Sequence, residues 1–207
     1  MGLLHLLLTN PVTFIFLAIP LLYSIIIHEL AHGWVAYKMG DPTAKLLGRL
    51  SLNPLKHLDP IGTLMLFVVG FGWAKPVPVN FSNLHGSRKG IVFVSAAGIV
   101  ANTVLAFLAF FLNRLLAPSP TGVFALLLYY MAQINIMLAA FNLIPIPPLD
   151  GSKILMGVTS GSFQRFLMSL ERYGFFIVII LLYLGVLDPL IAFFRSLLLM
   201  LIRLLLP

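Results

Sequence analysis

Three ionisable residues lie within five positions of one another, in the run His28-Glu29-Leu30-Ala31-His32. Residues i and i+4 share one face of a helix, so His28 and His32 can present both imidazoles to one metal ion. Glu29 is the next residue along, where its carboxylate can reach a metal-bound water rather than the metal. This spacing predicts zinc-assisted hydrolysis, in which bound zinc lowers the pKa of water toward ~7 and Glu29 takes the proton.

A catalytic zinc ion needs a third protein ligand and one open position for water. The chain has no cysteine, so this ligand must be a histidine or a carboxylate. We expect it to be Asp150, which follows the non-helical run Pro145-Ile-Pro147-Pro148; such backbone is tolerated at membrane depth only where it is buried or lines a cavity. Zn²⁺ with two neutral imidazoles and the carboxylates of Asp150 and Glu29 sums to zero, as a low-dielectric site requires. One zinc ion per chain is therefore expected.

The composition places this site in a membrane. Of the 207 residues, 60% are apolar and 9% are charged, whereas soluble domains carry roughly 25% charged residues. An ordinary cytosolic globule, a disordered chain and a nucleic-acid-binding protein are thereby excluded. The net charge of +7, from 13 basic and six acidic residues, indicates cytoplasmic loops instead. Ionisable groups inside a span are costly, which marks His28, Glu29 and His32 as functional.

The elements that must position the site form one integral membrane domain over residues 1–207. We expect an all-α polytopic bundle of about five to six transmembrane helices, with a small β or re-entrant element after the first helix. Asn10 and Pro11 have the residue types of a helix N-cap and first turn. The expected spans are residues 11–39, 89–116, 121–141, 173–187 and 190–206. Residues 61–72 are too short to cross the bilayer and are predicted to re-enter, and residues 152–172 are predicted to be interfacial.

The basic residues predict the orientation. None precedes Lys38, and with the N-terminus outside, eleven of the thirteen lie on the cytoplasmic side. These eleven are Lys38, Lys45, Arg49, Lys56, Lys75, Arg88, Lys89, Lys153, Arg165, Arg172 and Arg203. We therefore expect a multi-pass protein of the cell membrane with its zinc site toward the cytoplasmic side.

Taken together, His28-Glu-Leu-Ala-His32 and Asn142-x-x-Pro145-x-Pro-Pro-x-Asp150-Gly151 resemble the motifs of the site-2 protease family of intramembrane zinc metalloproteases. The stretches at residues 48–54, 57–63 and 72–80 resemble it as well. The resemblance implies His28, His32 and Asp150 as zinc ligands and Glu29 as the general base. It also implies hydrolysis of peptide bonds in or near a transmembrane segment of a single-span substrate.

The chain departs from the family pattern in one span. Where the family commonly has Ala-Gly-Pro-x-x-Asn, this sequence reads Ala97-Gly98-Ile99-Val-Ala-Asn102. The difference concerns a local kink rather than the metal site. The stretches between spans are short, so the chain resembles the short form of the family, without PDZ or CBS domains.

Three further polar residues have two interpretations each. Asn142 and Asn102 could donate to an oxyanion or pair with the substrate backbone, or they could form hydrogen bonds between helices. His57 could contact the substrate or a gate, or it could be an interfacial histidine beside Lys56.

Two other functions use the same residues. A divalent-metal transporter, or another metal-binding membrane protein, could employ the same His and Asp groups, but it needs a polar path across the bundle. Residues 91–112 and 173–187 carry hardly any ionisable groups. An inactive scaffold has no support, because every expected catalytic residue is present.

The expected partners are the lipid bilayer and a single-span membrane protein, without nucleic acid; the sequence does not define the oligomeric state.

Overall fold

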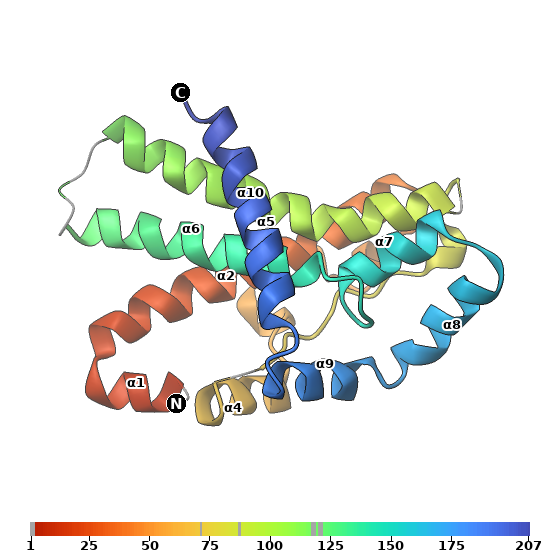
Figure 1. The fold of residues 1–207 in the computed structure, drawn as a ribbon, viewed down its shortest axis with the longest axis horizontal. Helices are drawn as coiled ribbons and strands as arrows, with labels where there is room; N and C mark the ends of the chain where they lie inside the picture. Colours follow the sequence, from red (N-terminus) through yellow and green to blue (C-terminus); the bar gives the residue numbers. More distant parts are fainter. Residues whose placement is uncertain (1–2, 71, 87, 117–118, 120–121) are drawn as a thin grey trace.

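The computed structural model describes residues 3–70, 72–86, 88–116, 119 and 122–207, and this part of the chain is built from helices (Figure 1). The helices are α1 (Leu3–Thr9), α2 (Pro11–Lys38), α3 (Thr43–Leu46), η1 (Pro54–Lys56), α4 (Pro60–Val68), η2 (Phe81–Asn83), α5 (Arg88–Leu116), α6 (Val123–Asn142), α7 (Asp150–Val158), α8 (Gly161–Glu171), α9 (Gly174–Tyr183) and α10 (Asp188–Leu205). The predicted all-α class is confirmed. Within the described residues, β structure is limited to one isolated bridge.

Three helices, α2, α5 and α6, are long and apolar enough to cross a membrane, and the bent pair of α8 and α9 could supply a fourth span. The predicted count of five to six is not confirmed. The ten residues of α9 reach about 15 Å, which is half of a ~30 Å hydrocarbon core. The eighteen residues of α10 include the charged residues Asp188, Arg195 and Arg203. Hydropathy alone does not resolve such short or interrupted segments.

The helix that carries the predicted site, α2, begins as its sequence predicts. The Asn10 side chain accepts a hydrogen bond from the Thr13 backbone N–H at 3.1 Å, and Pro11 occupies the first turn, where its missing N–H costs nothing. The helix then continues for 28 residues. This single uninterrupted element holds His28, Glu29 and His32 in fixed relation to one another.

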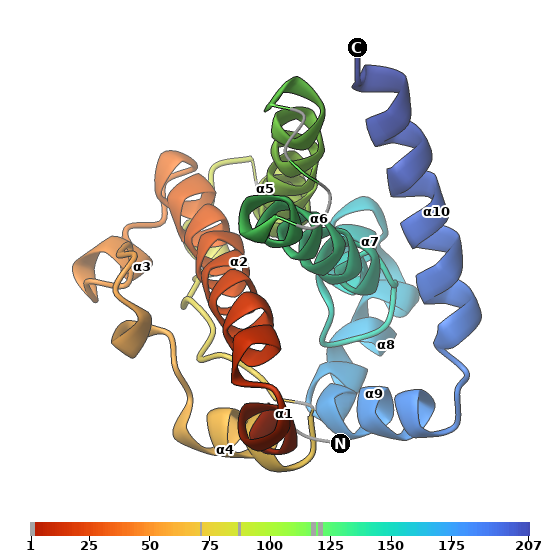
Figure 2. The same cartoon turned by 90° about the vertical axis from the view of Figure 1, so that its left-hand side faces the viewer.

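The helices α2, α5 and α6 lie side by side (Figures 1 and 2). Alanines fill much of the contact between α5 and α6. The buried alanines of these two helices are Ala106, Ala109, Ala125, Ala132, Ala139 and Ala140. Small residues let helix backbones approach closely inside a bilayer. The C-terminal helix α10 crosses this layer steeply (Figures 1 and 2) and packs on it through Leu198 and Ile202.

Between α2 and α5 the chain leaves at Leu58, passes through α4 and returns to the same place at Ala74. We call this segment the excursion. Leu58 forms an antiparallel bridge with Ala74, and the Lys75 N–H donates to the His57 carbonyl at 2.8 Å. The predicted β element is not confirmed beyond this bridge. The two ends of the excursion lie together, as a re-entrant segment requires; of the predicted residues 61–72, Phe71 lies outside the described residues.

Asp41 ties the end of α2 to the chain that returns from this excursion. It is fully buried and accepts hydrogen bonds from the Asn80 N–H at 2.7 Å, the Asn83 side-chain amide at 3.0 Å and the Thr43 N–H at 3.2 Å. Burial by itself raises the pKa of this carboxyl, but the hydrogen bonds from Thr43, Asn83 and Asn80 outweigh burial, and the pKa lies below its ordinary value of 3.8.

We predict that Asp41→Ala lowers the free energy of unfolding by about 2–3 kcal/mol, because it leaves several buried donors unpaired. Thermal unfolding in detergent measures this, with Thr43→Val, which removes only one hydroxyl donor, as the milder control.

A carboxyl whose pKa is depressed in the folded state stabilises the fold above its ordinary pKa, and this stabilisation is lost as the pH falls through the folded value. The difference between wild type and Asp41→Ala should therefore shrink below pH 3.8; a pH-independent difference contradicts the assignment.

Candidate metal centre

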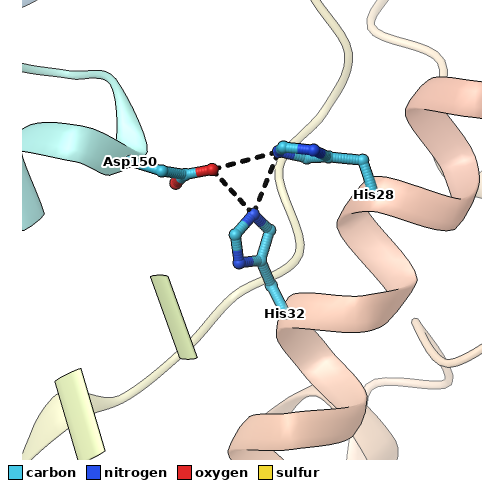
Figure 3. Close-up of side chains that lie close together, drawn as sticks. All are labelled: His28, His32 and Asp150. Carbon is cyan, nitrogen blue, oxygen red and sulfur yellow. Dashed lines mark hydrogen bonds and ion pairs between the residues drawn. The ribbon is translucent and has the colours of Figure 1, made fainter. Parts of the chain in front are cut away.

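Side chains from α2 and from the first residue of α7 converge on one point (Figure 3). The Asp150 Oδ2 lies 3.1 Å from the His28 Nε2 and 3.0 Å from the His32 Nε2, and the two Nε2 atoms are 3.0 Å apart. All three residues are buried, with exposed fractions of 7%, 8% and 6% for His28, His32 and Asp150. The structure thus brings together the three residues that the sequence singles out as ligands.

A chain of hydrogen bonds determines which nitrogen of His28 carries the proton. The Asn135 side-chain N–H donates to the Met131 carbonyl at 2.8 Å, and a carbonyl can only accept, so the Asn135 Oδ1 faces the other way. That oxygen accepts from the Asn102 Nδ2 at 3.1 Å. The Asn102 Oδ1 then faces the His28 Nδ1 at 2.8 Å, which must be the donor. The Nε2 of His28 is therefore left with a lone pair.

His32 has the same tautomer as His28, and a single hydrogen bond determines it. Its Nδ1 lies 2.7 Å from the Val94 carbonyl oxygen and must donate to it, which leaves a lone pair on Nε2. Three acceptors, the two Nε2 atoms and the Asp150 Oδ2, then face one another, and the Asp150 Oδ2 receives no hydrogen bond. Buried lone pairs that face each other repel, and either a metal ion between them or a proton on one Nε2 relieves this repulsion.

The ligand set and the available space both fit zinc. Nitrogen and oxygen ligands about 2.0–2.1 Å from a tetrahedral zinc ion lie about 3.3 Å from one another, and the observed separations of 3.0–3.1 Å are close to this. Gly98 of α5 leaves the space open. A Cβ at this position would overlap the His32 Nε2 and would lie 2.5 Å from the His28 Cε1.

Asp150 owes its position to the Pro-rich loop between α6 and α7. The loop brings the chain back against the end of α6, and Gly151 permits the approach, since a Cβ there would lie 2.6 Å from the Ile144 carbonyl oxygen. Asp150 occupies the first turn of α7, where the helix dipole stabilises a negative charge. Lys153, one turn later, lies 3.8 Å from the other carboxylate oxygen.

Glu29, next to His28 in the sequence, is half-buried, and a backbone N–H from the segment between α4 and α5 holds its carboxylate. Its Oε2 accepts a hydrogen bond from the Val77 N–H at 2.8 Å. Val77 belongs to the extended segment formed by residues 73–80, which Asp41 anchors through Asn80. One carboxylate oxygen is therefore fixed, and the other has no protein hydrogen bond among those found for the described residues.

The two predicted asparagines have different surroundings. Asn102 is fully buried and its amide bonds to His28 and Asn135, so it lies behind a ligand rather than in front of the metal. Asn142 is half-buried at the end of α6, and its Nδ2 donates to the Leu138 carbonyl at 3.0 Å. One N–H of that amide remains available.

The sequence analysis missed several contributors to the site: Asn135, Ser24, the carbonyls of Val94 and Met131, and the Val77 N–H. The Asn135 Nδ2 also donates to the Ser24 Oγ at 2.8 Å, which closes the network behind His28. A polar residue in the middle of an apolar span, such as Asn135, was the available signal. A backbone carbonyl such as that of Val94 leaves no signal in the sequence.

Comparisons with known proteins agree with this centre. A family model described as "Peptidase family M50" matches residues 118–185, which include Asp150. The "Putative zinc metalloprotease YwhC" of Bacillus subtilis is 44% identical over 174 residues, covering 80% of this chain and 79% of the relative. The "Putative zinc metalloprotease Rip2" of Mycolicibacterium smegmatis is 33% identical over 167 residues, covering 78% of this chain and 64% of the relative.

A more distant similarity links the chain to "Zinc metalloprotease MJ0392" of Methanocaldococcus jannaschii, at 28% identity over 151 residues, covering 73% of this chain and 36% of the relative. No solved structure matches the chain significantly. The donor set fits zinc, and these relatives are named as zinc metalloproteases. With this ligand geometry, and with similarity extending over most of the YwhC protein, the chain belongs to peptidase family M50, the site-2 protease family of zinc metalloproteases.

Proposed function

We propose that this protein is an intramembrane zinc endopeptidase that hydrolyses peptide bonds in or near the transmembrane segments of other membrane proteins. The observation that carries the proposal is the position of the centre: three buried acceptor atoms converge on α2, a helix long and apolar enough to span a bilayer. His28, His32 and Asp150 would hold one zinc ion. When bound, zinc polarises the scissile carbonyl and lowers the pKa of a coordinated water.

Glu29 is the proposed general base. The Val77 N–H holds one carboxylate oxygen, which leaves the other oxygen to accept a proton from the attacking water. The same group can then deliver this proton to the amine that leaves. Asn142, with one free amide N–H beside the Pro-rich loop, remains a candidate to stabilise the oxyanion. For Asn102 the contacts favour a role in positioning His28.

In the membrane, the proposed orientation has the N-terminus outside and the zinc site toward the cytoplasm. Lys38 ends α2, while Arg88 and Lys89 begin α5. Cleavage would then take place near the cytoplasmic end of a single-span substrate. The transporter alternative has no comparable support, because α6 and α9 contain no Asp, Glu, Lys or Arg, and the charged residues of α5 lie near its ends.

Glu29→Gln is predicted to keep zinc and to lose cleavage. Zinc content by mass spectrometry should stay near one ion per chain, because Glu29 is not a proposed ligand. Cleavage of a reporter transmembrane peptide should fall about 10²–10⁴-fold, the usual contribution of a general base. Asp150→Ala is the matched control and should lose both. If Glu29→Gln cleaves as fast as wild type, Glu29 is not the base.

Asn102→Leu is predicted to weaken zinc binding about 10- to 100-fold, as is typical when the partner of a metal-bound histidine is removed. The variant leaves the His28 Nδ1–H without its acceptor, so the ring can turn and take the other tautomer. Thr103→Val is the matched control on the same helix, because Thr103 donates only to the Ile99 carbonyl. Competition with a zinc chelator measures both affinities, and equal affinities in the two variants would refute the positioning role.

A further inference from the structure

The extended segment of residues 73–80 contains two prolines, Pro76 and Pro78, which flank Val77. Proline has no N–H, and it restricts the residue before it to extended conformations. The Val77 N–H is therefore the one backbone donor of residues 76–78, and it sits in a stiff stretch of chain. This N–H donates to the Glu29 Oε2 at 2.8 Å. The segment thus presents a single donor to the proposed general base.

Gly33 of α2 lets this segment approach the helix closely. It lies four residues after Glu29 and therefore on the same helix face. A Cβ at Gly33 would lie 2.7 Å from the Val77 Cγ1 and 2.7 Å from the Leu50 Cδ2. Val77 is buried there. Two stretches of chain, one with Leu50 and one with Val77, consequently meet beside the proposed base.

Arg49 joins these two stretches by a hydrogen bond. Its Nη2 donates to the Lys75 carbonyl at 2.8 Å, and its backbone N–H donates to the Ala44 carbonyl at 2.8 Å. Ala44 is fully buried, and its Cβ would lie 3.2 Å from a Cβ at Gly33. Arg49 is therefore attached to structure that packs directly on α2.

The Arg49 side chain makes this bond at a cost in free energy. It is half-buried, and its Nε is shielded from solvent and has no hydrogen-bond partner among the described residues. Within the same part of the chain no carboxylate forms an ion pair with it. A cation in such surroundings calls for a functional explanation. The group that its guanidinium holds is the peptide immediately before Pro76, two residues from Val77.

We propose that Arg49 is a positioning residue for the general base: by holding the Lys75 carbonyl, it keeps the stiff residues 76–78 where the Val77 N–H meets the Glu29 carboxylate. The inference rests on the proposed protease function and extends it to a residue outside the metal centre. Asp41 holds the far end of the same segment through the Asn80 N–H. Arg49 is the anchor that a substitution removes without touching the buried hydrogen bonds of Asp41.

The first test observes the Val77 N–H directly and needs no substrate. The chain has three Pro–Val pairs, so ¹³C on proline carbonyls combined with ¹⁵N on valine amides selects the N–H groups of Val12, Val77 and Val79 in NMR spectra. Their hydrogen-exchange rates are measured on zinc-loaded protein in detergent. The Val12 N–H, in the first turn of α2, serves as the internal reference.

We expect Arg49→Met to accelerate exchange of the Val77 N–H about tenfold, because the segment loses one anchor. The matched control is Lys56→Met, which removes a bond of similar length within the loop itself, from Lys56 to the Gly48 carbonyl at 2.8 Å. It should change the Val77 rate less than about twofold. Glu29→Leu, which removes the acceptor, should accelerate Val77 exchange as well.

The second test measures cleavage of the reporter transmembrane peptide. Arg49→Met should lower kcat about tenfold and leave KM and zinc affinity unchanged, because the base is misplaced while the zinc ligands are not. Arg49→Lys keeps a donor for the Lys75 carbonyl and should regain most of kcat. Thermal unfolding and zinc content verify that each variant is folded.

An unchanged Val77 exchange rate in Arg49→Met would overturn the inference, as would faster exchange with an unchanged kcat. A parallel loss of zinc affinity would show that Arg49 is only structural and would overturn it too. Failure of the proposed function gives a different result. In that case zinc-loaded wild-type protein cleaves no peptide while the exchange rates still respond to Arg49→Met, and the role of Arg49 toward a base falls together with the base.

Discussion

Two backbone carbonyls, those of Val94 and Met131, determine the chemistry of the metal centre. A carbonyl oxygen can only accept a hydrogen bond, so each one sets the direction of every bond that leads from it. From Val94 the route to His32 is a single bond, and from Met131 it passes through Asn135 and Asn102 to His28. Both imidazoles consequently turn a lone pair toward the Asp150 carboxylate, the arrangement that three ligands of one metal ion adopt.

One stripe of α5 supplies most of this support. Val94, Gly98 and Asn102 are spaced four residues apart and therefore lie on the same helix face. The first gives the carbonyl for His32, the second leaves room for the two rings, and the third orients His28. The close packing of α5 on α2 brings this stripe to the motif. A family pattern with glycine and asparagine at these two positions thus has a physical reason in the structure.

The site was predictable from the sequence because its chemistry is local. His28 and His32 are one helical turn apart, and Asp150 stands out as a carboxylate after a run that cannot be helical. The supporting bonds were not predictable, because they join residues that are distant in the chain: Asn102 to His28, Val94 to His32 and Val77 to Glu29. The predicted count of five to six spans is not confirmed for a similar reason. Hydropathy does not show that α8 and α9 meet at 78°.

The most direct test of this account is the zinc X-ray absorption spectrum of protein loaded with one equivalent of zinc. The account predicts nitrogen and oxygen ligands at about 2.0–2.1 Å with the multiple scattering of two imidazoles. His32→Ala should remove the contribution of one imidazole. A spectrum without imidazole scattering, unchanged by substitution of His28 or His32, would contradict the proposal that the converging lone pairs exist to hold the metal.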